Sequence, residues 1–197
     1  MSFVVSAAGP PGAGKTTLCA RLAKKEFLDG LHGSCGSLLH ALGDPKLETI
    51  LARGDLAPEH YVERVIERLF EEANGKPVML EGVPRHAGHP AMLAKILARW
   101  GYTWLVHFNL YCPHQTALAR VHARATENGK RMDDDAFEKR YGIYQKSLPG
   151  LNAMIKGEGL PDLAVPRPAF HKLDGRNYPD MVANEAMKII HELRRAA

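Results

Sequence analysis

Apolar residues along the chain fall into two kinds of pattern. Short segments rich in apolar residues have the length of buried strands, and a weaker candidate leads into a helix-like segment. These segments cover residues 3–8, 31–37 (the weaker one), 77–80, 103–110 and 169–173. Elsewhere apolar residues recur every three or four positions, which predicts helices with one buried face. These segments cover residues 18–23, 45–53, 58–73, 92–100, 113–126, 137–151 and 182–193.

The order of these segments indicates the fold class. Strand-like and helix-like segments alternate, which is typical of an α/β fold with a parallel sheet covered by helices. A polar break at residues 127–130 and a stretch with several glycines and prolines at residues 157–168 are predicted to be loops. The length of 197 residues suits a single domain with a sizeable core.

The most specific motif lies between the first strand and the first helix. Residues 9–17 read Gly-Pro-Pro-Gly-Ala-Gly-Lys-Thr-Thr and fit the phosphate-binding P-loop pattern G-x-x-x-x-G-K-[ST]. Glycines let backbone N–H groups turn toward one anion, and the following helix adds its positive end. Lys15 can reach the β- and γ-phosphates, and the Thr16 hydroxyl can hold Mg²⁺. The predicted nucleotide-binding residues are Gly9, Pro11, Gly12, Ala13, Gly14, Lys15, Thr16 and Thr17.

Composition narrows the choice of partners. The net charge is +4, but no run of five basic residues occurs, which argues against nucleic acid and suits small polyanions. No apolar run is long enough to cross a membrane, and the run at residues 3–8 is too short for a signal peptide. The three widely spaced cysteines favour a reducing compartment, so we expect a cytoplasmic protein.

A second motif combines the end of a strand with a turn. Residues 78–85, Val-Met-Leu-Glu-Gly-Val-Pro-Arg, place Glu81 where a strand ends and Arg85 in the turn that follows. Ligands of open α/β sheets bind at the carboxyl ends of strands. There a carboxylate can hold the hydration shell of Mg²⁺, and a guanidinium can clamp a phosphate. A purely structural role is the alternative, because acids and arginines are common at such places.

Arginines form a series in the second half of the chain. Arg120 and Arg124 lie four positions apart and share a helix face, Arg131 follows the polar break, and Arg140 lies on the next predicted helix. They form either a solvated basic face or a cluster around a phosphoryl group, whose transfer needs positioned cations. The acidic residues after Arg131 either cap the next helix or pair with arginines.

In the first half of the chain, these motifs resemble those of the adenylate kinase family of nucleoside monophosphate kinases, which includes UMP/CMP kinases. Residues 9–17 look like the family loop G-x-P-G-x-G-K-[GS]-T, and residues 32–40 are similar to H-x-S-T-G-D-L-L-R. Residues 54–58 resemble G-x-L-V-P, and residues 81–85 resemble D-G-F-P-R.

The resemblance continues in the same order to the end of the chain. Arg120, Arg124 and residues 131–134 are similar to R-x-x-x-R followed by G-R-x-D-D, and Arg140 matches an arginine on the next helix. Asp174 and Gly175 resemble the D-G/A turn after the last strand. The G-V-P-R turn and the R-x-D-D element are more specific than the P-loop, which many families share.

The resemblance implies a reversible transfer of the γ-phosphoryl group of ATP to a nucleoside monophosphate, with Mg²⁺ held through water by Thr16 and Glu81. It implies a P-loop NTPase three-layer fold with a five-stranded parallel sheet, formed by a single domain at residues 1–197. A helical lobe at residues 32–72 would bind the monophosphate, and a short lid at residues 125–132, without zinc, would close over ATP. The partners would be small nucleotides, and the protein would be a monomer without membrane or nucleic-acid ligands.

The resemblance also assigns roles to residues. Six cations would surround the transferred phosphoryl group or hold the acceptor's phosphate, namely Lys15, Arg85, Arg120, Arg124, Arg131 and Arg140. Gly175 would lie beside ATP. The acceptor would contact Cys35, Gly36, His40, Ala57, Gly82, Arg85 and His89. No general base is needed, because the attacking phosphate oxygen is already largely anionic near neutral pH.

The acceptor side departs from the family pattern. His40 replaces an arginine, Cys35 and Ser37 replace threonine and aspartate, and His89 replaces a glutamine or asparagine. AMP is the first acceptor to test, while UMP, CMP or a deoxynucleotide stay open. A small-metabolite kinase, a slow P-loop ATPase and a nucleotide-binding regulator with an eroded acceptor site are the alternatives.

Overall fold

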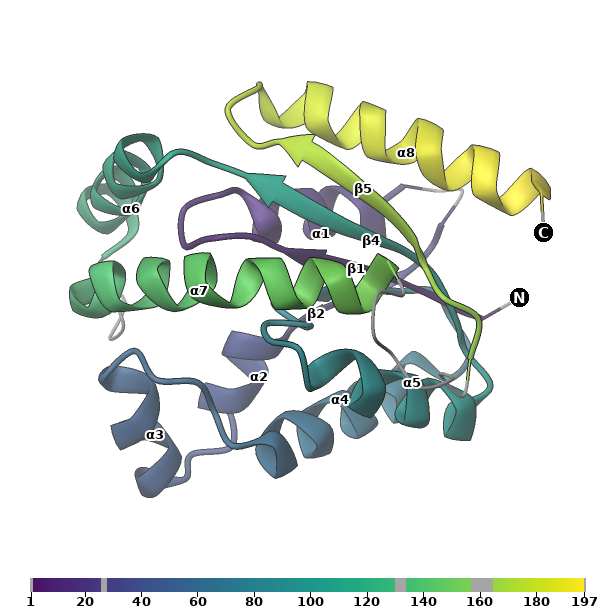
Figure 1. The fold of residues 1–197 in the computed structure, drawn as a ribbon, viewed down its shortest axis with the longest axis horizontal. Coiled ribbons are helices and arrows are strands. Elements are labelled where there is room, and N and C mark those ends of the chain that lie inside the picture. The colour runs from purple at the N-terminus through teal and green to yellow at the C-terminus, as the bar shows by residue number, and fades with distance from the viewer. Residues whose placement is uncertain (1, 26–27, 130–133, 157–164, 197) are drawn as a thin grey trace.

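The computed structural model describes residues 2–25, 28–129, 134–156 and 165–196. Five parallel strands form one sheet in the order β2-β3-β1-β4-β5 (Figure 1). The strands are β1 (Phe3–Ala8), β2 (Leu31–Ser34), β3 (Val78–Glu81), β4 (Thr103–Tyr111) and β5 (Ala169–Asp174). This arrangement confirms the α/β fold class and the five-stranded parallel sheet.

Eight α-helices lie in the described residues. They are α1 (Lys15–Ala23), α2 (Cys35–His40), α3 (Pro45–Ala52), α4 (Glu59–Ala73), α5 (His89–Trp100), α6 (His114–Asn128), α7 (Phe137–Lys156) and α8 (Pro179–Ala196). A short 3₁₀ helix, Asp134–Ala136, precedes α7. Each predicted helical segment corresponds to an observed helix, with bounds that differ by a few residues. Helix α7 continues past residue 151 to Lys156, and α2 takes up the end of the weak segment at residues 31–37. The polar residues Glu127 and Asn128 continue α6, which ends where Gly129 takes a positive φ of 80°.

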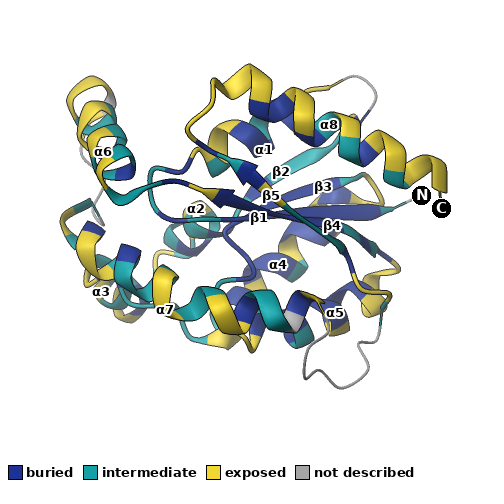
Figure 2. Cartoon of the chain, turned by 45° about the horizontal axis from the view of Figure 1, so that its top comes forward, coloured by how far each residue is buried: buried dark blue, intermediate teal, exposed yellow. Residues whose placement is uncertain are grey.

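The elements form three layers, as Figure 2 shows. Helices α1 and α8 cover one face of the sheet, and α4, α5 and α7 cover the other. All six residues of β1 are buried because side chains of both its faces enter a core, which explains why its sequence is apolar except for Ser6. Val5 packs in the core under α1 and α8, whereas Val4 packs in the core under α4 and α5.

The periodic pattern of α4 explains its place in the fold. Val62, Val65, Ile66, Leu69 and Phe70 are buried on one stripe of this helix. The helix ends at Asn74, whose φ of 46° is left-handed, a conformation that asparagine tolerates better than most residues.

The carboxyl ends of all five strands point toward one edge of the sheet. Helices α2, α3 and α6 lie beyond this edge, while β1 begins and α8 ends at the opposite one (Figure 1). The loops that follow β1, β3, β4 and β5 therefore meet in one region, which is where ligands of such sheets bind. No helix within the described ranges combines the length and apolar character that a bilayer crossing needs.

Candidate functional site

The P-loop joins β1 to α1 and forms a backbone cradle. Gly14 directly precedes α1 with a left-handed φ of 93°, and Gly12 has a φ of 77°. A Cβ atom on Gly12 would lie 2.3 Å from the carbonyl oxygen of Ala117, so only glycine fits there. The ammonium of Lys15 donates a hydrogen bond of 2.7 Å to the carbonyl oxygen of Pro10 and closes the loop.

Lys15 is a buried cation between charges of both signs. Burial is the main cause that lowers the pKa of Lys15 to about 8; the negative charge of Glu81 opposes this shift, and the positive charges of Arg85 and Arg140 add to it. A bound phosphate would favour the charged form of Lys15, because an anion beside a cation stabilises its charge.

Glu81 ends β3 directly beside the P-loop. Its carboxylate accepts a hydrogen bond of 2.7 Å from the Thr16 hydroxyl and lies 3.2 Å from Nε2 of His32. Burial alone would raise the pKa of Glu81, but the hydrogen bonds from His32 and Thr16 and the charge of Lys15 outweigh it and lower the pKa. A hydroxyl and an ionised carboxylate this close are the oxygen ligands that Mg²⁺ prefers, so these two residues fit that ion.

A large cleft contains most of the predicted residues. It encloses about 2460 Å³ of space open to solvent. The predicted residues that line it are Pro11, Gly12, Ala13, Gly14, Lys15, Thr16, Thr17, Gly36, His40, Glu81, Arg85, Arg120, Arg124, Arg140 and Gly175. Gly9 lines a smaller adjoining cavity together with Lys15, Arg85 and Arg140. The predicted donor-side residues thus surround one continuous space.

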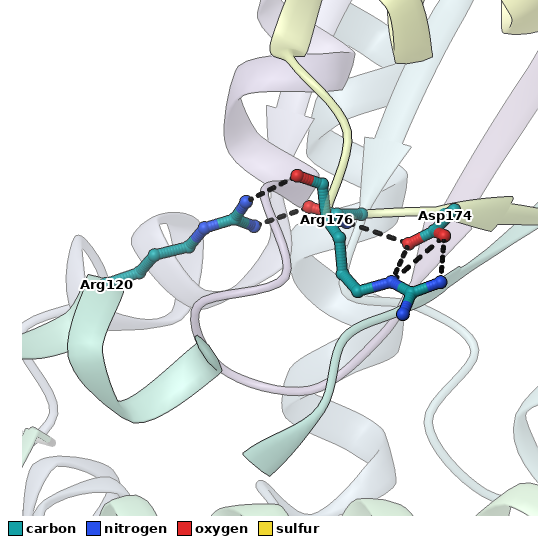
Figure 3. Close-up of polar contacts among 4 residues, drawn as sticks. Arg120, Asp174 and Arg176 are labelled. Carbon is teal, nitrogen blue, oxygen red and sulfur yellow. Dashed lines mark hydrogen bonds and ion pairs between the residues drawn. The ribbon is translucent and has the colours of Figure 1, made fainter. Parts of the chain in front are cut away.

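Arg120 is held by the turn between β5 and α8. Its guanidinium donates hydrogen bonds to the carbonyl oxygens of Gly175, at 2.5 Å, and Arg176, at 3.4 Å (Figure 3). Arg176 in turn forms two-point contacts with the carboxylate of Asp174. A Cβ atom on Gly175 would lie 2.7 Å from the carbonyl oxygen of Ala13, so this turn packs directly against the P-loop. Arg120 therefore ties α6 to the mouth of the cradle.

Arg124 lies one turn further along α6 and forms an ion pair with Asp134. Both residues line the cleft, and Asp134 comes from the 3₁₀ helix that precedes α7. Of the two roles that the sequence left open for the acidic residues, pairing with an arginine is thus observed. Arg131 and the other residues at 130–132 of the predicted lid lie outside the described residues.

The predicted acceptor residues line a second, smaller cavity. It lies between α2, α3, α4 and the turn after β3. The predicted residues in its wall are Cys35, Gly36, His40, Ala57, Gly82, Arg85 and His89, together with Arg140. Gly36, His40, Arg85 and Arg140 line both this cavity and the large cleft, so three basic side chains stand where the two spaces join.

His89 is a buried, neutral side chain in the wall of this cavity. It is 2% exposed, and its Nδ1 accepts a hydrogen bond of 3.0 Å from the backbone N–H of Arg85. Burial is the main cause that lowers the pKa of His89 to about 3, with smaller contributions from His86 and Arg85. The proton of the neutral ring therefore sits on Nε2, which has no hydrogen-bond partner in the described structure. The neutral ring of His89 therefore offers one hydrogen-bond donor, its Nε2–H group.

The lobe formed by α2, α3 and α4 touches α7 across the cavity. A Cβ atom on Gly54, whose φ is 74°, would lie 2.6 Å from Cβ of Ala136. The adjacent Asp55 forms an ion pair with Lys139 at the start of α7. These contacts hold the lobe against the basic edge of the cleft that carries Arg140.

Sequence reasoning missed one residue of the site. Glu48 lies on α3 and lines the large cleft, and its carboxylate contacts Nδ1 of His40 at 2.8 Å and 3.1 Å. Nothing in the spacing along the chain pairs these two residues, because they lie on different helices joined by a turn.

The chain matches known proteins over most of its length. A family model described as an AAA domain matches residues 5–141. The chain is 33% identical over 162 residues to an adenylate kinase of Parvibaculum lavamentivorans, which covers 77% of this chain and 78% of that protein. An adenylate kinase of Xylella fastidiosa is 33% identical over 160 residues, with 77% and 84% covered. One of Thermus thermophilus is 29% identical over 181 residues, with 88% and 89% covered.

Proposed function

The chain belongs to the adenylate kinase family of phosphotransferases, and from this premise we propose that it transfers the γ-phosphoryl group of ATP to AMP. One observation carries the proposal. His40, Arg85 and Arg140 stand where the cleft of the P-loop joins the cavity behind it. Two phosphate groups that entered from the two sides would meet at these basic side chains.

On the donor side, the P-loop would hold the triphosphate of ATP. Lys15 would contact the β- and γ-phosphates, and the turn at Gly175 would flank the nucleotide. Thr16 and Glu81 would hold Mg²⁺, with Glu81 acting through water. The bound ion would neutralise charge on the phosphates.

At the junction, the chain's own cations would position the reacting groups. Arg85 would hold the phosphate of the acceptor, while Lys15, Arg120, Arg124, Arg131 and Arg140 would surround the moving phosphoryl group. An oxygen of the acceptor's phosphate forms the new bond to the γ-phosphorus, and the bond to the bridging oxygen of ADP breaks. No protein group has to accept a proton, because the attacking oxygen is already largely ionised near neutral pH.

Two segments would close around the substrates. We propose that residues 32–72 form the acceptor-binding lobe and that residues 125–132 form a short lid. Residues 32–34 belong to β2, which pairs with β3, so the proposed lobe begins within the sheet. Closure would exclude water and prevent hydrolysis of ATP.

A coupled assay for ADP tests the proposal. The purified protein is given ATP and Mg²⁺ with AMP, UMP, CMP, dAMP or no acceptor, and the Lys15→Met variant is the control. We expect rapid ADP formation only with a monophosphate and fastest with AMP. Equal ADP formation without acceptor would indicate an ATPase, and ATP binding without turnover on any acceptor would indicate a nucleotide-binding regulator.

The monomeric state and the cytoplasmic location expected from the sequence stay predictions. Size-exclusion chromatography with light scattering measures the first of them. A mass near 21.7 kDa, that of one chain, would agree with a monomer.

A further inference from the structure

His40 and Glu48 form a pair of side chains that faces the proposed meeting point of the substrates. His40 is the last residue of α2, and Glu48 lies in the middle of α3. Nδ1 of His40 lies 2.8 Å and 3.1 Å from the two carboxylate oxygens of Glu48. Both side chains are partly buried and line the large cleft.

The position of Glu48 is fixed by neighbouring contacts. Asp44 caps α3, because its Oδ1 accepts hydrogen bonds from the backbone N–H groups of Lys46, at 2.8 Å, and Leu47, at 3.3 Å. Its other carboxylate oxygen accepts a hydrogen bond of 2.7 Å from the Tyr61 hydroxyl on α4. The start of α3 is thereby tied to α4, which holds the Glu48 carboxylate in place opposite the imidazole.

The pairing with Glu48 determines which nitrogen of the His40 ring is available to a ligand. A carboxylate only accepts, so the proton of Nδ1 points at Glu48 and Nε2 is left for another partner. Nε2 makes no hydrogen bond to a residue that the structure describes. A neutral ring would present a lone pair there and repel a phosphate, whereas a protonated ring would present an N–H group and attract it.

The surrounding charges act in both directions on this proton. Arg85 and Arg140 line the same junction and oppose a further positive charge, whereas Asp55 in the wall of the cavity favours it. The other charged residues that line the cleft are Lys15, Glu81, Arg120, Arg124 and Asp134. The Glu48 carboxylate and an acceptor phosphate favour the protonated ring. Imidazole is the side chain that changes its charge between about pH 5 and pH 8.

We propose that Glu48 is a positioning residue that makes His40 a proton-dependent clamp for the phosphate of the acceptor. This inference rests on the proposed function, and it adds that acceptor binding takes up a proton at Nε2 of His40. Acceptor affinity then falls as the pH rises, in contrast to a site clamped only by arginines.

Isothermal titration of the full chain with AMP at pH 6 and pH 8 tests the inference. The reference is His40→Arg, whose guanidinium stays charged at both values. The ionisation of AMP and of Lys15, whose pKa is about 8, is common to both proteins and cancels in their ratio. We expect the ratio of the wild-type to the His40→Arg dissociation constant to rise about tenfold from pH 6 to pH 8, as loss of a charged hydrogen bond implies. An unchanged ratio would overturn the inference.

Glu48→Gln separates positioning from a structural role. It removes the charge that favours the protonated ring, so we expect about tenfold weaker AMP binding at pH 6 and little change at pH 8. An equal loss at both values would mean that Glu48 only supports the lobe. Glu72→Gln, an exposed residue of α4, is the matched control and should bind AMP as the wild type does. The Glu48→Gln variant also keeps the test decisive if His40→Arg does not fold.

Turnover is measured separately on the same proteins. Failure of the wild type to phosphorylate AMP would contradict the proposed function, while the binding ratios would still decide the role of His40. Absence of AMP binding at both pH values would overturn both.

Discussion

The two proposed binding regions, the P-loop side of the cleft and the cavity behind it, are built differently. The proposed donor side is shaped by backbone, because a Cβ atom on Gly12 or Gly175 would strike carbonyl oxygens of neighbouring segments. The proposed acceptor side is lined by side chains, with His40 paired to Glu48 and His89 held by the N–H of Arg85. A backbone cradle tolerates few sequences, whereas a side-chain site can change its residues and keep its fold. This explains why the donor side matches the family pattern and the acceptor side departs from it.

The two sides also differ in charge. Burial lowers the pKa of Lys15 to about 8, with Arg85 and Arg140 adding to the shift and Glu81 opposing it. In the cavity behind the cleft, His89 is neutral with a pKa of about 3, and burial raises the pKa of the Cys35 thiol to about 11. If the proposed function holds, we expect the P-loop side to bind phosphates through charge and the part of the cavity near His89 and Cys35 to bind an uncharged base.

The largest expected effect concerns the arginines at the transfer point. Arg124→Ala and Arg131→Ala should each slow turnover by about 10³–10⁵, as removal of a transition-state arginine does. Steady-state kinetics with ATP and AMP measure this. Arg99→Ala, on the exposed face of α5, is the control. A turnover that falls only a few-fold in both variants would support the alternative that these arginines form a solvated basic face.

Lys15→Met should come next. It removes the one ammonium in the P-loop, so ATP binding should be lost and turnover should fall by about 10²–10³, a typical cost of removing one charge-stabilising donor. Equilibrium titration with ATP and the coupled assay measure the two quantities. The exposed Lys24→Met variant should behave as the wild type. Retained ATP affinity in Lys15→Met would contradict the donor-side assignment.

Arg85→Ala should affect binding of the acceptor and leave binding of ATP largely unchanged. It should raise the Michaelis constant for the acceptor by about 10–100-fold, since a charged hydrogen bond contributes about 1.5–3 kcal/mol. Turnover should fall as well, while ATP affinity stays similar. Initial rates with each substrate varied in turn give both constants. An equal loss of ATP affinity would show that Arg85 serves the donor side.

The pH dependence of ATP binding should follow Lys15. Its pKa is lowered, so the ammonium is present below about pH 8 and is lost as the pH rises through that value. The dissociation constant for ATP should therefore rise by up to about tenfold per pH unit above pH 8. Titrations between pH 7 and pH 9.5 measure it. A constant affinity over this range would argue that Lys15 does not contact the phosphates.

The smallest effect concerns His89. His89→Asn keeps an oxygen near Nδ1, where Arg85 donates, and removes the Nε2–H donor. We expect the Michaelis constant for the acceptor to rise about 2–10-fold, the cost of about one neutral hydrogen bond, without a change for ATP. Because its pKa is about 3, His89 stays neutral, so this effect should be the same at pH 6 and pH 8. His122→Asn, at an exposed position of α6, is the control, and a pH-dependent effect of His89→Asn would contradict the neutral assignment.

Most of the fold could be predicted from the sequence because local patterns report burial. The mostly apolar sequences of β1 and β4 and the stripe of α4 are read directly from the chain. The signal was weak at β2, an edge strand in which only Gly33 is buried. It placed the end of α6 two residues early, because a helix that leaves the core can carry polar residues to its last turn.

Less of the site could be predicted. The P-loop and the Glu81–Arg85 turn were found because each is a short, contiguous motif. The partners of Arg120 and Arg124 were not assignable, since carbonyl oxygens carry no sequence signature and Asp134 is one of several adjacent acids.

By itself, the sequence determined an α/β chain with a phosphate cradle and a set of basic residues spread over most of its length. Tertiary structure alone decided which of these cations share one space, that Glu48 faces His40, and that the ring of His89 is neutral. Local patterns arise from neighbours in the chain, and the sequence displays them. The protonation of a side chain and the meeting of distant residues in one cleft depend on burial and on distances in space. Only the folded arrangement of sheet and helices sets these.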